Sequence, residues 1–289
     1  FISIALFNFF QSILLMEVQE YIEKKVEIQT DILELIDNEE DVNGNLQKIF
    51  DHLDSQHIFE DKNEFISFIH LLHKISKNHN RTANFFFKIE QIIMHIKEHF
   101  HNFFTNSEIF NFFKADKRIL LFLIEQKIIA IDQSIVDIMK NQKYQKLNYL
   151  SYFINEIESF LDEKTKEEIK ELLYDIDSFE EKRQVGENES YICQLIRNDS
   201  IEDFISFINR NNIGLSSTIN NSIFETNSFL LKNQATLIEY AAFFGSIQIF
   251  NFLNMNKIEL KPSLWLFVIH GRNPELIHFL EDNHIKPND

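Results

Sequence analysis

Two neighbouring segments near the end of the sequence match each other when one is shifted by 27 residues. Residues 236–256 are TLIEYAAFFGSIQIFNFLNMN, and residues 263–283 are SLWLFVIHGRNPELIHFLEDN. Self-similarity at a period of roughly 20–50 residues is the sequence signature of stacked repeats. This period therefore restricts the region to a repeated supersecondary unit.

Each copy has the pattern of two short helices. A hydroxyl residue, Thr236 or Ser263, can cap the first helix. A polar break follows at Gly245 or Arg272, and Pro274 suits the first turn of a second helix because no N–H is needed there. Two short helices leave one apolar side uncovered, so we expect stacked neighbours to bury it, as in an α-solenoid.

A degenerate earlier copy is expected at residues 191–209. It repeats the second-helix pattern with Phe204, Ile205, Phe207 and Ile208. The Asn- and Ser-rich residues 212–233 separate this copy from the clear ones. We interpret them as a long loop with one short helix around residues 223–229.

Composition favours helices along the whole chain. With 5 Gly and 3 Pro in 289 residues, hairpins and tight turns lack the residues that they need. The 31 Phe residues recur at helical spacing, which indicates core packing and not an aromatic binding surface. We therefore predict an all-α fold.

Residues 16–177 have the pattern of successive amphipathic helices, which predicts a helical N-terminal domain. Apolar stripes occur at Leu46, Ile49, Phe50 and Leu53, and at Ile89, Ile92, Ile93, Ile96 and Phe100. The apolar run at residues 119–124 predicts a helix buried on most of its circumference. Thr165 and Glu168 have capping-box spacing and predict a helix start there. The apolar residues of that helix would be Ile169, Leu172, Leu173 and Ile176.

Two segments depart from this pattern. Residues 178–189 are charged and carry no apolar stripe, so we interpret them as the linker before a repeat region at residues 190–289. Residues 1–15 are apolar but shorter than the roughly 20 residues of a membrane span. We interpret them as an apolar leader or a translated upstream extension before Met16, with a membrane anchor as the alternative. We also expect further repeats after residue 289, because the sequence stops inside a loop.

The first copy carries a family resemblance. Residues 236–246 (TLIEYAAFFGS) resemble the ankyrin consensus T-P-L-H-x-A-A-x-x-G-H, and residues 247–253 resemble x-E-I-V-x-L-L. Leu237 and Glu239 stand where the consensus has Pro and His, and the 27-residue period is shorter than the usual ankyrin length.

The chain is similar to a divergent group of eukaryotic ankyrin proteins with a helical N-terminal region and an ankyrin-like domain of unknown function. The resemblance is clear over roughly residues 190–289 and loose before them. It implies an ankyrin-like α-solenoid of stacked helix pairs and a non-catalytic scaffold that binds another protein.

The resemblance also suggests where a partner would bind, because ankyrin partners contact the first helices and the loop tips. The matching positions in this chain are Phe243, Phe244, Gly271 and Arg272 on the first helices and Glu259 and Lys261 at the loop tip. Two adjacent exposed Phe residues would be a strong anchor, since aromatic residues dominate interface energetics. Packing of both rings under the insertion at residues 212–233 is the alternative.

The sharpest enzymatic alternative is a zinc-dependent hydrolase, because residues 95–99 (HIKEH) fit the motif H-x-x-E-H. On a helix, His95 and His99 lie one turn apart and could both ligate zinc, with Glu98 as general base. A third ligand is required, and an acidic chain offers carboxylates by chance. We expect the two histidines to flank the apolar stripe of their helix, with no metal or other cofactor.

Charge and cysteine content restrict partners and compartment. A net charge of −17 repels a phosphate backbone, so we expect no nucleic-acid partner. No Gly-rich phosphate loop is recognisable, and no small-molecule substrate is expected. A single cysteine, Cys193, fits a reducing compartment. The sequence therefore predicts a cytoplasmic protein whose contact with membranes would be limited to residues 1–15.

Overall fold

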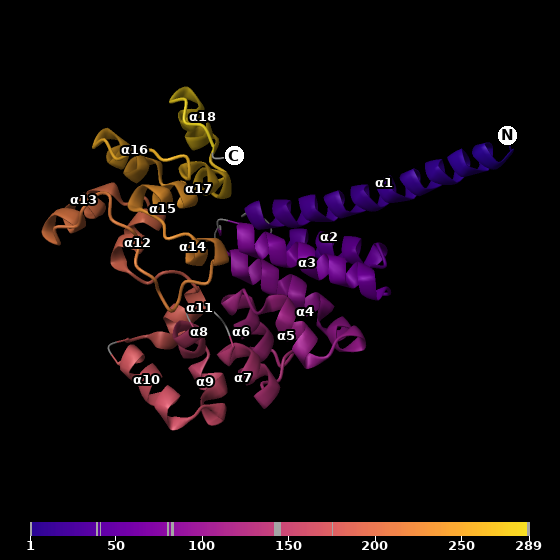
Figure 1. The fold of residues 1–289 in the computed structure, drawn as a ribbon, viewed down its shortest axis with the longest axis horizontal. Helices are drawn as coiled ribbons and strands as arrows, with labels where there is room; N and C mark the ends of the chain where they lie inside the picture. Colours follow the sequence, from indigo (N-terminus) through magenta and orange to yellow (C-terminus); the bar gives the residue numbers. More distant parts are fainter. Residues whose placement is uncertain are drawn as a thin grey trace. The chain divides into compact units, whose positions relative to one another are not determined.

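The computed structural model describes residues 2–38, 40, 42–79, 81, 84–141, 146–174 and 176–287 (Figure 1). Across these residues the regular structure is helical, without a strand, and the one exception is an isolated bridge between Thr218 and Thr236. The prediction of an all-α fold is confirmed. Short polar loops join the helices, as the scarcity of Gly and Pro requires.

The chain forms two compact units. Unit 1 consists of Phe1–Ile75 and Arg81–Phe103, and unit 2 consists of Ser76–Asn80 and Phe104–Asp289. The division lies well before residues 178–189, where the sequence suggested a linker.

Unit 1 is built from long helices, of which α2 to α4 are amphipathic. They are α1 (Ile2–Asp37), α2 (Val42–Ser55), α3 (Lys62–Asn78) and α4 (Phe85–Phe103). The predicted stripe of α4 is buried at all five positions, namely Ile89, Ile92, Ile93, Ile96 and Phe100. In α2, Leu46, Ile49 and Leu53 are buried, whereas Phe50 is half-buried and stacks on His95.

A buried lysine joins α4 to the end of α1. Lys88 is fully buried, and its Nζ donates hydrogen bonds to the carbonyl oxygens of Ile36 (2.9 Å) and Asn38 (2.8 Å). The last carbonyls of a helix have no partner within the helix and carry partial negative charge. The Lys88 side chain therefore extends through the core, and its ammonium group donates hydrogen bonds to the carbonyl oxygens at the C-terminal end of α1.

The interpretation of residues 1–15 concerns side chains that lie outside the described part of the structure. Their backbone, from residue 2 onward, belongs to the continuous helix α1. Over the residues that were searched, which are the described ones, no helix combines the length and apolar content needed to cross a membrane.

Unit 2 begins with short helices. They are α5 (Asn106–Phe113), α6 (Lys117–Glu125), α7 (Gln133–Lys140), α8 (Lys146–Tyr152), α9 (Ile154–Ile157), a 3-10 turn (Glu158–Phe160), α10 (Glu163–Leu173) and α11 (Phe179–Val185). The apolar run at residues 119–124 lies in α6, which is buried from Lys117 to Leu123. The prediction of a helix buried on most of its circumference is confirmed.

The predicted start of α10 is wrong by three residues. Asp162 is the N-cap, and its Oδ1 accepts a hydrogen bond from the Thr165 backbone N–H (2.9 Å). Aspartate caps a helix as well as a hydroxyl residue does, so the earlier residue takes the role. Of the four apolar residues expected to face the core, only Ile169 is buried, and Leu172 is 38% exposed.

The predicted linker contains a helix that packs inside unit 2. Arg183 of α11 is buried, and its guanidinium donates to Glu156 (2.7 Å) and Glu180 (2.8 Å) and to the Tyr152 carbonyl oxygen (3.1 Å). Gly186 ends α11 in a left-handed conformation (φ 69°). The segment looked like a linker because a paired arginine, and not an apolar stripe, holds it in place.

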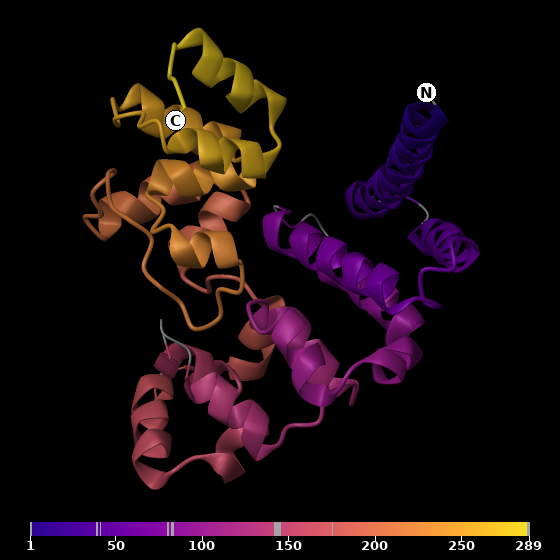
Figure 2. The same ribbon diagram turned by 45° about the vertical axis from the view of Figure 1, so that its right-hand side comes forward.

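The remaining helices form pairs (Figures 1 and 2). They are α12 (Tyr191–Arg197) with α13 (Ile201–Arg210), α15 (Leu237–Phe244) with α16 (Ile247–Met255), and α17 (Leu264–Gly271) with α18 (Pro274–Asp282), while α14 (Ser228–Lys232) lies between the first and second pairs in the chain. The helices of the second and third pairs begin and end 27 residues apart, as the sequence period predicted. In residues 212–233 the short helix starts later than expected, at Ser228.

The three pairs share the same turn bonds after their second helices. The side-chain amides of Asn211, Asn256 and Asn283 each donate to the carbonyl oxygen four residues earlier, at 2.8–2.9 Å. The next residue has a positive φ in each case, at Asn212, Lys257 and His284. Equivalent bonds at equivalent positions show that residues 191–210 are a structural counterpart of the two clear copies.

The pairs stack along their first helices. α15 packs against α12 on one side and α17 on the other, and α13 packs against α16. The rings of Phe250 and Phe279 meet edge to face, 5.3 Å apart, between α16 and α18. One hydrophobic core therefore runs through all three pairs.

Candidate functional site

Phe243 and Phe244, predicted to anchor a partner, lie in and beside the core. Phe243 is fully buried, and the ring of Phe229 from the 212–233 insertion stacks on it at 5.8 Å. Phe244 is half-buried against Tyr240, with ring centroids 4.8 Å apart. The exposed-anchor interpretation is therefore corrected for Phe243, since the insertion covers it as the alternative predicted.

Gly271 is a packing residue and not a surface position. A Cβ at this position would lie 2.3 Å from the carbonyl oxygen of Ala242, so only glycine allows α17 to approach α15 this closely. Arg272 follows it, is exposed, and has a left-handed backbone (φ 51°) that ends α17. Its Nη1 lies 3.1 Å from Nε2 of His79.

Glu259 and Lys261, like Arg272, are predicted binding residues that lie at the surface. Both are exposed in the loop between α16 and α17. They line a groove with the apolar side chains of Ile238, Ile258 and Leu264 and with the polar residues Ser216, Thr236 and Glu239. No hydrogen bond or ion pair of either charged side chain is found among the described residues, so both charges are available to a partner.

We call this groove the loop-tip groove. A capping box connects Thr236 and Glu239, which both line it. Thr236 caps α15, and the Glu239 carboxylate accepts hydrogen bonds from the Thr236 backbone N–H (2.9 Å) and hydroxyl (2.8 Å). The Ser263 hydroxyl donates to the other carboxylate oxygen (2.8 Å) and so connects α15 to the start of α17. The position that departs from the ankyrin consensus, Glu239, therefore joins two neighbouring pairs.

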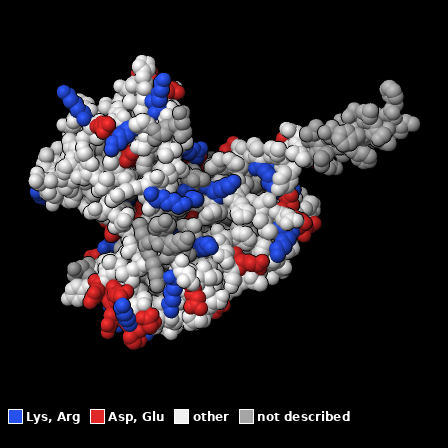
Figure 3. Space-filling view, in the orientation of Figure 1, with Lys and Arg blue, Asp and Glu red and all other residues white. Residues whose placement is uncertain are grey.

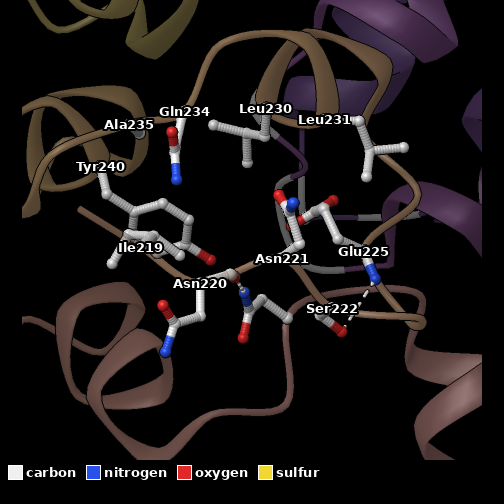
Figure 4. A pocket seen from close by; sticks show the side chains of 11 residues that line it. Ile219, Asn220, Asn221, Ser222, Glu225, Leu230, Leu231, Gln234, Ala235 and Tyr240 are labelled. Atoms are coloured by element: carbon white, nitrogen blue, oxygen red, sulfur yellow. Dashed lines mark hydrogen bonds between the residues drawn. The ribbon is translucent and has the colours of Figure 1, made fainter. Parts of the chain in front are cut away.

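A second hollow, lined by both polar and apolar residues, lies beside the insertion (Figure 4). Figure 4 shows the Tyr240 hydroxyl and the Gln234 amide directed into a space bordered by Leu230 and Asn221. The Asn188 side-chain amide, also in the lining, donates to the carbonyl oxygen of Asn220 (2.9 Å). These contacts fasten the insertion to the segment before α12.

Tyr240 connects the lining of this hollow to a group of hydrogen-bonded interior side chains. Arg197 donates to the Tyr240 hydroxyl (2.9 Å) and pairs with Glu187 (2.8 Å). Burial raises the pKa of Tyr240 well above its usual value, and burial raises the pKa of the Cys193 thiol to about 11. Because the thiolate is the nucleophilic form, Cys193 is a poor nucleophile at neutral pH.

The two histidines of the H-x-x-E-H helix pack against aromatic rings. His95 stacks on Phe50 (4.2 Å) and its Nε2 lies 2.9 Å from an Asp54 carboxylate oxygen. His99 stacks instead on Phe59 (4.8 Å), and Glu98 is exposed. In the described parts of the chain, no three His, Cys, Asp or Glu side chains come together as metal ligands.

Acidic side chains gather over α10. Figure 3 shows this region as the strongest concentration of red in that view, and the helix carries the exposed acids Glu163, Glu167, Glu168 and Glu171. The hydrogen bond and charge of Lys166 lower the pKa of Glu163. Such a surface repels polyanions.

Comparison with family models, with curated proteins and with solved structures gives no match for this chain. The geometry of the site is therefore the basis for a functional assignment.

Sequence reasoning missed the part played by α14. Asn227 caps this helix, accepting hydrogen bonds from the backbone N–H groups of Phe229 (2.9 Å) and Leu230 (3.3 Å). An Asn followed by Ser-Phe-Leu-Leu is a recognisable helix start. The position of Phe229 against the first helices depends on tertiary packing.

Proposed function

We propose that this protein is a non-catalytic scaffold of the ankyrin type that binds another protein through the loop-tip groove. The observation that carries the proposal is the set of three equivalent helix pairs, stacked with their first helices adjacent. Repeats of this kind build a continuous surface from equivalent loops. Thr236 at the N-cap of α15 and Gly245 at its left-handed C-cap occupy the Thr and Gly positions of the consensus, which supports the likeness to ankyrin repeats.

The groove suggests the chemistry of its partner. The half-buried Ile258 offers apolar area above the buried Ile238 and Leu264, and Glu259 and Lys261 place one negative and one positive charge at its border. An apolar centre with a charged rim is the usual anatomy of a protein interface. The fitting partner is a segment with an apolar side chain between a basic and an acidic residue.

The proposal is tested by cross-linking from inside the groove. A photoreactive amino acid at position 259 should capture a partner protein in cells. The same amino acid in place of the exposed Glu202 of α13 should not capture that protein. The purified partner should then lose affinity for a variant with Glu259→Lys and Lys261→Glu. We expect a loss of roughly tenfold, because two rim charges change sign.

A partner that binds the reversed variant as tightly as the native chain would contradict the assignment to this groove. Combining the variant with a partner whose flanking charges are also reversed provides the matched control. Recovery of affinity in that combination is expected if the charges meet directly.

The compartment remains a prediction. A cytoplasmic scaffold agrees with the single buried, unpaired Cys193. Fractionation of cells that express the full chain would test it.

A further inference from the structure

The helix α14 covers the first helices of two pairs with a single aromatic side chain. The ring of Phe229 lies 5.8 Å from Phe243 and 5.0 Å from Phe267, and 3.9 Å from the His270 ring. We call Phe243, Phe267 and His270 the aromatic socket. Because α15 and α17 supply its residues, the socket is built by the same helices that border the loop-tip groove.

The chain before α14 is firmly held. Residues 222–227 are buried, and the Thr226 backbone N–H (3.1 Å) and hydroxyl (2.6 Å) both donate to the Gly186 carbonyl oxygen. The Lys117 ammonium donates to the carbonyl oxygen of Ile223 (2.6 Å). Movement of α14 therefore leaves this anchor in place.

The helix itself is weakly held by comparison. It has five residues, Phe229, Leu230 and Leu231 are half-buried, and Lys232 is exposed. Two buried polar atoms at its start, Asn227 Nδ2 and Ser228 Oγ, have no hydrogen-bond partner among the residues that the structure describes. A buried polar group without a partner destabilises the arrangement that buries it. These atoms lie where α14 joins the buried segment, so this junction has fewer hydrogen bonds than the segment before it.

We propose that α14 is an internal ligand of the aromatic socket, and that it gives way to a short helix of a partner protein carrying one aromatic residue. This inference rests on the proposed scaffold function and specifies its second contact. The present occupant argues for this chemistry, because a one-turn helix capped by Asn and carrying a single Phe already fits the socket. A partner helix of that kind would reproduce the ring contacts of Phe229.

Hydrogen exchange of the full-length native chain tests whether α14 opens. The backbone N–H groups of Leu231 and Asn233 are bonded within α14, and that of Tyr240 is bonded within α15. We expect the first two to exchange by local opening, at least about tenfold faster than Tyr240 and without dependence on low denaturant. Exchange of all three at one common rate, through global unfolding, would overturn the proposal.

A peptide with the sequence of residues 226–233 (TNSFLLKN) tests the socket directly. The variant Phe229→Ala removes the ring that occupies the socket, and exchange in α14 should rise by roughly tenfold to a hundredfold. The labelled peptide should bind this variant at least about tenfold more tightly than the native chain. Phe207→Ala is the matched control, because the half-buried Phe207 packs on Tyr191 away from the socket.

Several outcomes would reject the idea. Equal binding of the peptide to the native chain and to a folded Phe229→Ala variant is one, and equal binding of a peptide with Ala in place of Phe is another. A native dimer with exchanged α14 segments would assign the socket to a second copy. If the variant does not fold, the exchange measurement on the native chain still decides. Charge reversal at Glu259 and Lys261 leaves these readouts unchanged, so the two proposals fail separately.

Discussion

The second and third helix pairs have the same register but different burial. Along α15 every residue from Leu237 to Phe243 is buried, whereas α17 exposes Leu266 (52%) and Ile269 (57%). The residues 27 positions before these two are Glu239 and Ala242, which contact Ser263 and Gly271 of the third pair. The difference shows that burial of a first helix requires a neighbour on each side, and that one pair does not complete its own core.

The largest loss of stability is expected at buried leucines that occupy equivalent positions in the second and third pairs. Leu253 of α16 and Leu280 of α18 are both fully buried and are related by the period. Replacing either by Ala should lower the free energy of unfolding by about 2–5 kcal/mol, through lost burial and the cavity left behind. Urea denaturation measures this free energy of unfolding, and Met255→Ala, at an exposed position, is the control. A loss at one position alone would show that the pairs are not equivalent.

A smaller loss is expected where α17 approaches α15. Gly271→Ala places a Cβ against the Ala242 carbonyl oxygen, and backbone atoms have little freedom to move away. Overpacking of this kind costs about 1–3 kcal/mol. Gly214→Ala, whose new Cβ would make an ordinary contact 3.4 Å from the Ser217 hydroxyl, is the matched control in thermal denaturation. Equal stability of the two variants would show that α17 does not depend on this close approach.

The caps of the second helices distinguish the pairs further. Asp199 of the first pair caps α16 from outside, accepting hydrogen bonds from the backbone N–H groups of Gln248 (2.9 Å) and Ile249 (3.0 Å). Asn273 caps α18 locally. Each replacement by Ala should cost about 1 kcal/mol, but only Asp199→Ala should also loosen the contact between α13 and α16. Hydrogen exchange in α13 separates the two variants; identical patterns would contradict the cross-pair role.

The smallest effect is expected at the exposed face of α17. Leu266→Ser and Ile269→Ser should each change the free energy of unfolding by no more than about 0.5 kcal/mol, because these side chains already contact water. Ala242→Ser, which inserts a hydroxyl between α15 and α17, is the comparison and should cost more. A large loss at Leu266 in a purified, monomeric sample would contradict the exposure of this face.

Sequence reasoning identified the elements that have strong local patterns. The stripe of α4, the buried run of α6 and the 27-residue register all depend on residues close together in the chain. It failed at α11, where Arg183 and its carboxylate partners replace an apolar stripe. It also failed at the start of α10, because two capping signals stood three residues apart and the local pattern does not rank them.

The candidate site was predicted in part. Glu259 and Lys261 lie at the surface because the loop between two stacked pairs must face solvent. The surroundings of Phe243 and Gly271 could not be assigned from the consensus. Phe243 is covered by Phe229 of α14, and Gly271 lies against α15, so both positions depend on contacts between different helices.

The sequence by itself determined the helical class, the period and the turns within the two clear pairs, because spacing and capping act over a few residues. Only the tertiary structure decided that α14 fills the aromatic socket and that residues 178–189 belong to the body of unit 2. Those contacts join segments tens of residues apart. The energies of these contacts depend on which surfaces pack together, and the spacing of residues within one helix does not determine that.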